Sequence, residues 1–176
     1  MANACVDAND FQTDAGGRLQ LNPTTAQSAS ATFSHALTGV DGTYENINEL
    51  PGVVVPINGL YLVMWDIHGY IALPSPNIGI DLQGQVMGAL SIDNIFQANT
   101  ETMIATLNEG APASADEDVP ALGQEATGSG SRIFQLTAGQ VLRIMGAQSG
   151  NGSNDSRILS DGDGRCRITI VRLGSS

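Results

Sequence analysis

The clearest pattern in the chain is residues 53–69, VVVPINGLYLVMWDIHG, where hydrophobic and polar positions do not alternate. A strand with one face on a core and one in water should alternate with a period of two. Here residues 60–65 are apolar without a break. One face of this strand would carry Tyr61, Val63, Trp65 and Ile67, and the other Leu60, Leu62 and Met64. We therefore expect both faces to be covered.

The rest of the chain is dominated by short strand patterns bounded by Gly, Pro, Asn and Asp. The TAGQ stretch (137–140) is typical of a tight hairpin connection, and the one run that favours a helix, 91–98, is short. Strands are predicted over residues 52–57, 59–68, 77–82, 85–92, 101–108, 131–137, 140–147 and 165–173. This spacing predicts an all-β sandwich or barrel.

Residues 1–25 form a distinct opening segment that is too short to fold alone. We predict that it is an arm or anchor that contacts other proteins through Phe11, Leu19 and Leu21, and that residues 26–176 form the domain; the alternative is that the segment is the first edge of that domain. Two long polar stretches, 108–131 and 149–164, are expected to be surface loops.

The doubly apolar strand needs a cover for its second face. The runs 133–136 (IFQL) and 141–145 (VLRIM) also carry apolar residues on both sides. Because a large exposed patch is unusual on a monomer, the economical cover is another copy of the chain, and we predict a cyclic homo-oligomer. Arginines among apolar strand residues pair with carboxylates at subunit contacts, or equally end at the rim. The predicted interface consists of Leu60, Leu62, Met64, Arg143 and Arg172.

Charge and cysteine content narrow the functional classes. The net charge is −11, with seven arginines and no lysine, which disfavours nucleic acid and anionic membranes as partners. No run approaches the roughly 20 apolar residues of a membrane helix, and the first residues lack a secretory signal pattern. We expect a protein made in a cytoplasm, with Cys5 and Cys166 as free thiols; a disulfide between them is the alternative.

Patterns for catalysis and metal binding are weak. Asp66 and His68 lie two residues apart on one strand face and could form half of a hydrolase triad, but no motif places a nucleophile, and a polar strand end explains them equally simply. The acidic stretches 116–118 (DED) and 161–164 (DGDG) could offer oxygen ligands to calcium. They do not match an EF-hand, and Asp-Gly pairs are ordinary turn residues. We therefore expect no enzymatic activity and no cofactor or metal.

Three stretches resemble the complement globular-head and tumour-necrosis-factor jelly rolls. Residues 53–69 resemble the family's F-x-V-P-x-x-G-x-Y run, with Gly59 and Tyr61 at the matching positions. SRIFQLTAGQVLRIMGAQ resembles its L-x-L-x-x-G-D-x-V-x-L hairpin, with Gln140 where Asp is common, and RCRITIVRLG is loosely similar to its final strand. The resemblance covers about residues 30 to 174. It implies a jelly-roll β-sandwich of about ten strands that assembles as a compact trimer around an apolar axis.

The opening VDANDFQTDAGGRLQLNP resembles tail and fibre proteins of phages that infect actinobacteria. We therefore predict a non-enzymatic bacteriophage virion protein, a trimeric tail or fibre component that faces the host surface. Its partners would be its own copies, other virion proteins, and a glycan or protein of the host. The alternatives are a capsid decoration protein that stabilises the head, and a carbohydrate-binding module. Against the latter, Tyr44, Tyr70 and Trp65 are too scattered for a sugar platform.

Overall fold

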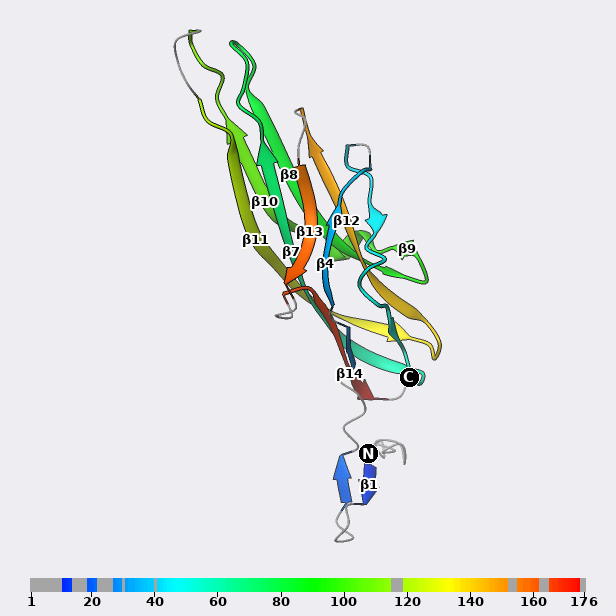
Figure 1. The fold of residues 1–176 in the computed structure, drawn as a ribbon. Helices are drawn as coiled ribbons and strands as arrows, with labels where there is room; N and C mark the ends of the chain where they lie inside the picture. Colours follow the sequence, from blue (N-terminus) through cyan, green and yellow to red (C-terminus); the bar gives the residue numbers. More distant parts are fainter. Residues whose placement is uncertain are drawn as a thin grey trace, which may run out of the picture.

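The computed structural model of the chain describes residues 11–13, 19–21, 27–29, 31–39, 41–114, 119–151, 155–161 and 165–174. Two six-stranded antiparallel sheets face each other as a β-sandwich (Figure 1). The first sheet contains β3 (Gln27–Ala29), β4 (Thr32–Ala36), β7 (Gly59–Leu73), β11 (Leu122–Leu136), β13 (Asp155–Asp161) and β14 (Arg167–Gly174). The second contains β5 (Glu45–Asn46), β6 (Val53–Val54), β8 (Leu82–Ile92), β9 (Ile95–Phe96), β10 (Thr102–Glu109) and β12 (Val141–Gly150).

The order of the strands is that of a jelly roll. β11 pairs with β7 along the whole of one edge. The other edge of β7 is shared by β14, which pairs with residues 60–66, and β13, which pairs with residues 69–72. The first sheet therefore has the order β3–β14–β7–β11 along one part of β7 and β4–β13–β7–β11 along the other, and the second sheet has the order β5–β12–β8–β10. Each sheet interleaves early and late strands of the chain, as two Greek keys do, so the all-β jelly-roll prediction is confirmed.

The core lies between the sheets, and β7 supplies its centre. The predicted inner face of this strand is confirmed, because Tyr61, Val63, Trp65 and Ile67 are each at most 4% exposed. The Tyr61 hydroxyl donates a 2.8 Å hydrogen bond to the carbonyl of Ile57, which satisfies its polar end. The second sheet contributes equally buried side chains, including Leu90, Leu142 and Ile144.

Two predicted elements are wrong because local turns interrupt them. Residues 77–80 form a turn and no strand: the amide of Ile80 donates to the carbonyl of Asn77, at 3.1 Å, and Gly79 has φ +73°. β8 begins only at Leu82. The run 91–98 is no helix but the β8–β9 hairpin, whose two turn residues have positive φ angles. Asp and Asn tolerate that conformation better than most residues. The 3-10 helix η2 (Ala98–Thr100) follows.

The two predicted loops are shorter than expected. β10 runs to Glu109 and β11 starts at Leu122, so strands take both ends of the stretch 108–131. β13 lies inside the stretch 149–164. The strand residues in these stretches are mostly polar, and backbone pairing stabilises them without a continuous apolar pattern: β11 and β13 pair with β7, and β10 pairs with β8. The TAGQ stretch forms a turn, with Gly139 at φ +88°, but it joins β11 and β12 of different sheets and so makes no paired hairpin.

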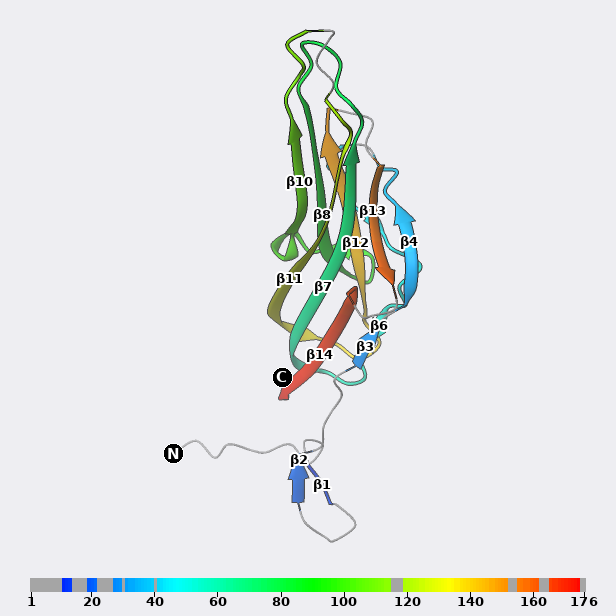
Figure 2. The same ribbon diagram turned by 60° about the vertical axis from the view of Figure 1, so that its left-hand side comes forward.

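The opening segment contains a separate two-stranded sheet. β1 (Phe11–Thr13) pairs with β2 (Leu19–Leu21), with Phe11 opposite Leu21 and Thr13 opposite Leu19. Figures 1 and 2 place this hairpin outside the sandwich. The side chains of Phe11, Leu19 and Leu21 lie outside the described part of the structure, so their anchor role stays a prediction. Within the described residues, no helix is long and apolar enough to span a membrane.

Candidate functional site

The outer face of the first sheet carries a group of apolar side chains from three neighbouring strands. Strand register creates it: Leu62 of β7 lies opposite Ile133 of β11 on one side and Val171 of β14 on the other. Leu60 is 37% exposed, Ile133 53% and Leu173 51%, and the rest are half-buried. We call the following residues the apolar patch: Leu60, Leu62, Met64, Ile133 and Val171, together with the exposed Leu173, which lies in the β-bulge of β14 between the partners of Tyr61 and Leu60.

The second sheet, in contrast, has a cover of its own over its outer face. Ala89, Met145 and Ala147 point outward from β8 and β12, yet they are 0%, 7% and 1% exposed. β5 and β9 lie beyond opposite edges of this strand pair. The rings of Tyr44 and Phe96, near these two strands, stack with centroids 4.6 Å apart and so bridge the face. No comparable bridge crosses the apolar patch in the part of the chain that the structure describes.

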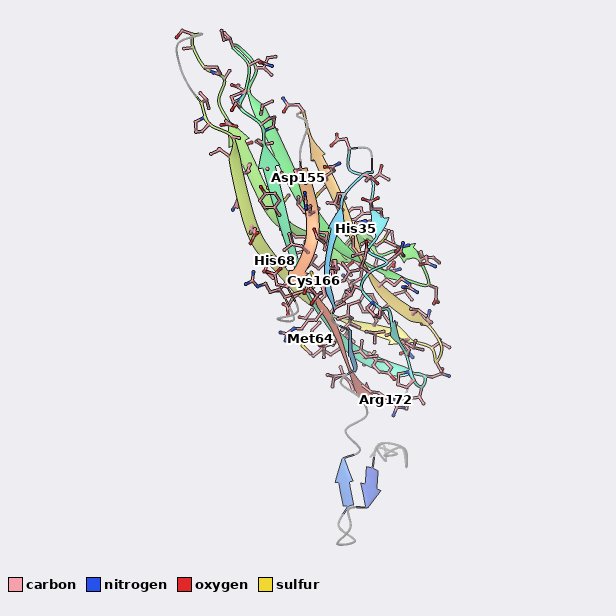
Figure 3. The ribbon with its side chains drawn as sticks, in the orientation of Figure 1. His35, Met64, His68, Asp155, Cys166 and Arg172 are labelled. Atoms are coloured by element: carbon pink, nitrogen blue, oxygen red, sulfur yellow. The ribbon has the colours of Figure 1, made fainter. Side chains whose placement is uncertain are left out.

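The five residues predicted for the interface do not form one surface. Leu60, Leu62 and Met64 lie together on β7, as expected, and Met64 is marked in Figure 3. Arg143 lies in β12, in the second sheet, opposite Ser91, so it does not join them.

Arg172 is on β14, next to β7, but it lies opposite an inward-facing residue of β7 and not opposite a residue of the apolar patch. It pairs with the buried Tyr61, and a Cβ added to Gly59 would lie 2.7 Å from its Nε. Arg172 therefore packs along Gly59 at the end of the sheet, on the side of Tyr61. The sequence could have indicated Ile133, which stands in an apolar run. Val171 and Leu173 gave no separate signal within the final strand.

A charged network lies along β7 beyond Met64. The carboxylate of Asp66 forms an ion pair with Arg167 of β14 and accepts a hydrogen bond from the hydroxyl of Ser129 of β11. All three residues share one row across the sheet. Asp66 is thus engaged by its cross-strand neighbours on both sides.

His68 lies further along the same outer face and is only 4% exposed. Its Nδ1 lies 2.9 Å from the hydroxyl oxygen of Thr127. Its Nε2 is 3.6 Å from a carboxylate oxygen of Glu125 and 3.5 Å from Nη1 of Arg165. Asp66 and His68 therefore hold separate partners, instead of pairing with each other as the Asp–His half of a triad would.

The described cysteine is a buried free thiol. Cys166 is 0% exposed, and its sulfur accepts from the backbone amide of His68 at 3.1 Å and donates to the carbonyl of Leu159 at 3.2 Å. Cys5 lies outside the described residues. Cys166 thus helps to hold the segment before β14 against β7 and β13.

The two acidic stretches considered for calcium are largely outside the described residues, namely 116–118 entirely and 162–164 of the second. Asp161 is described, and its carboxylate Oδ2 lies 3.9 Å from Nη1 of Arg165. Over the described ranges, no three or more His, Cys, Asp or Glu side chains gather in a way that could hold a metal ion.

The aromatic residues weighed for a sugar platform lie on three different surfaces. Trp65 is in the core, where its Nε1 donates to Thr102 at 3.1 Å. Tyr44 stacks on Phe96 outside the second sheet, and Tyr70 is half-buried on the outer face of the first. These three rings therefore cannot bind one sugar together.

No protein family model matches the chain. No curated protein matches it either. Among solved structures, the chain is similar to Eiger TNF from S. frugiperda, with 12% identity, 85% of this chain and 93% of that chain covered, and a TM-score of 0.34. A TM-score of 0.34 is too low to support a conclusion, so the jelly-roll assignment rests on this chain's own strand order.

Proposed function

We propose that the chain is a non-enzymatic jelly-roll domain that functions as a homotrimer, with the apolar patch of each copy turned toward the other copies. The observation that carries this proposal is the contrast between the two sheets. The chain bridges the outer face of the second sheet with the Tyr44–Phe96 stack but leaves Leu60, Ile133 and Leu173 substantially exposed on the first. The number of copies is supported by the resemblance of residues 53–69 to a family of trimeric jelly rolls.

The size of the patch agrees with a role in assembly. Each of Leu60, Ile133 and Leu173 is between about a third and a half exposed, so covering each contributes about 0.6–1.5 kcal/mol. Association costs at least about 4 kcal/mol in lost motion, so the assembly depends on covering the whole patch in every copy. A single charge at its centre should therefore disrupt the assembly.

The test is the variant Leu62→Asp, since Leu62 lies at the centre of the patch between Ile133 and Val171. We expect wild-type protein to have three times the chain mass of 18.3 kDa in size-exclusion chromatography with light scattering, and the variant to be monomeric or aggregated. The matched control is Ile95→Asp, because Ile95 is 68% exposed but belongs to the second sheet, and it should remain trimeric. A trimer that survives Leu62→Asp would contradict the interface.

We further propose that this trimer is a component of a bacteriophage tail or fibre that faces the host surface. The resemblance of the opening segment to such proteins supports it. The placement of the elements also supports it: the β1–β2 hairpin is at one end of the molecule in Figures 1 and 2, and the turns after β7 and β10 are at the other. One end could thus attach to the particle and the other contact the host.

Copy number per particle tests this location. Quantitative mass spectrometry of purified virions should find the chain in tens of copies or fewer, and antibodies against it should label the tail in electron micrographs. Hundreds of copies on the head would instead identify a decoration protein that stabilises the capsid. Absence from purified virions would exclude both.

A further inference from the structure

The outer face of the first sheet continues beyond the charged network into a second polar region. Tyr70 of β7 lies in register between Glu125 of β11 and Arg157 of β13, so these three residues form one row across the sheet. Tyr70 is six residues from Met64, which places this row roughly 20 Å along the strand from the apolar patch. Figure 3 shows Asp155, next to this row, on the far side of Met64 from the β1–β2 hairpin. The row is therefore separate from the proposed interface.

A cavity of about 310 Å³ lies over this row. Its volume is at the lower end of the range for small-molecule sites, roughly 300–1,000 Å³. The lining residues are Ser34, Tyr70, Glu125, Asp155, Arg157 and Leu159. By the alternation and register of β4, β7, β11 and β13, all of them belong to the outer face, and each is exposed or half-buried. Their side chains therefore converge on one space that is open to solvent.

The ring of Tyr70 leaves room for the cavity because it leans toward β11. Gly123 is opposite Ala72 and so diagonal to Tyr70 in the β7–β11 ladder. A Cβ added to Gly123 would lie 3.0 Å from the hydroxyl oxygen of Tyr70 and 3.3 Å from its Cε2. The ring therefore lies along the sheet over Gly123, away from β13. Its other side borders the cavity, which makes the half-buried ring a platform for a ligand.

A fixed polar pair lies on the β13 side of the cavity. Nε and Nη2 of Arg157 donate to the two carboxylate oxygens of Asp155, at 2.7 and 2.8 Å. This bidentate contact holds both groups in one plane, and it uses only two of the five N–H donors of the guanidinium. Glu125 offers acceptors from the β11 side, and its Oε2 lies 3.6 Å from Nε2 of His68. The charges around the cavity nearly balance, because Arg157 neutralises Asp155.

We propose that this cavity binds a neutral pyranose sugar, with its ring stacked on Tyr70 and its hydroxyls bonded to Arg157, Asp155 and Glu125. A pyranose has a face of C–H groups, which the negative face of an aromatic ring attracts, and hydroxyls that each donate and accept. The nearly balanced charges disfavour a strongly charged ligand. The Arg157–Asp155 pair is already ordered, so it loses little freedom on binding. The proposal rests on the host-facing role only for the source of the sugar.

The experiment is an NMR titration of the full-length protein with isotope-labelled tyrosine rings. The chain has three tyrosines, of which Tyr61 is 0% exposed and Tyr44 stacks on Phe96, so only Tyr70 borders the cavity. The probes are the methyl glycosides of glucose, galactose, mannose and N-acetylglucosamine. At least one should shift the Tyr70 signals with a Kd of about 10⁻³ M, as expected for one sugar ring in an open site, and should leave the signals of Tyr44 and Tyr61 in place.

Variants separate stacking from hydrogen bonding. Tyr70→Ala should weaken binding about 10-fold or more, measured by saturation transfer to the sugar, whereas Tyr70→Phe keeps the ring and should retain most of it. Arg157→Ala should weaken binding by a similar factor, and it decides the question if Tyr70→Ala does not fold, because the Arg157 side chain is 43% exposed. The matched control is Arg132→Ala, an exposed arginine of β11 outside the cavity lining, which should bind as wild type does.

Three results would overturn the proposal. The first is that none of the glycosides moves the Tyr70 signals up to about 20 mM, roughly 20 times the expected Kd. The second is that Arg157→Ala binds as tightly as wild type. The third is that only a cationic probe, N-acetyl-lysine amide, moves the signals, since Glu125 would then bind a basic side chain of a protein. Light scattering and copy number measure the trimer and its location separately, so these failures leave the proposed function standing.

Discussion

Replacing Gly130 with alanine tests how the apolar patch is positioned, because this glycine lets β11 lie directly against β7. Gly130 is opposite Trp65 in the ladder. A Cβ at this position would overlap Cζ2 and Cε2 of the indole and would lie 2.9 Å from its Nε1. Since Trp65 is only 4% exposed, its ring has little room to move away. The same ladder holds Ile133 opposite Leu62, so a shift here also disturbs the patch.

The expected cost follows from three contributions. Forcing an extra methyl group into a packed core costs about 1–3 kcal/mol. Displacing the indole also breaks its 3.1 Å hydrogen bond to Thr102, which is worth about 0.5–1.5 kcal/mol. Alanine restricts the unfolded chain and returns about 0.4–1 kcal/mol. The net destabilisation of Gly130→Ala should be about 1–3 kcal/mol, which lowers the Tm by roughly 3–10 °C in a domain of this size.

Differential scanning calorimetry at a fixed protein concentration measures this change. Trp65 is the only tryptophan of the chain, so its fluorescence emission reports directly on the displaced ring. The control is Gly110→Ala, where an added Cβ meets nothing within 4 Å; this variant should not be destabilised and should gain at most about 1 kcal/mol, because alanine restricts the unfolded chain in the same way. Combining Gly130→Ala with Trp65→Phe should reduce the cost of the alanine, because the smaller ring leaves space. An unchanged Tm and emission spectrum in Gly130→Ala would refute this account of the β7–β11 contact.

Two further predictions concern single side chains. The thiol of Cys166 is buried and engaged by His68 and Leu159, so a thiol reagent should label it only after unfolding in denaturant; peptide mapping that finds it labelled in native protein would contradict its burial. Burial alone would raise the pKa of Glu49, but hydrogen bonds from its own backbone amide and from His35 outweigh it and hold the pKa below the ordinary value of 4.5. The pair therefore stabilises the fold above pH 4.5, and this contribution is lost as the pH falls through the lowered pKa of Glu49. NMR titration of His35→Ala should show the pKa of Glu49 moving up, and an unmoved pKa would rule out the role of His35.

The fold class and the inner face of the central strand could be predicted from the sequence. Alternation along β7 separates Tyr61, Val63 and Trp65 from Leu60 and Leu62, because neighbouring side chains in any strand point to opposite faces. Turn residues such as Gly139 also marked a real chain reversal, because few other residues adopt a positive φ. These features depend on local geometry alone.

The sequence did not predict which strands lie next to each other in the sheets. Arg143 and Ile133 stand in similar apolar runs, yet β12 carries the first into the second sheet while β11 sets the second beside Leu62. A two-residue period tells which side chains share a face of one strand, but it does not tell which strands lie next to each other. The pairing of segments that are distant in the sequence decides which strands are neighbours.

The candidate site also combines features that local sequence sets with features that strand pairing sets. By itself, the sequence determined that β7 is apolar on both faces and that the chain folds as an all-β sandwich. Only the tertiary structure decided that the Tyr44–Phe96 stack covers one sheet and that the patch on the other is open among the described residues. The reason is physical: whether a side chain is covered or neutralised depends on residues far away in sequence, and long-range strand pairing alone brings them together.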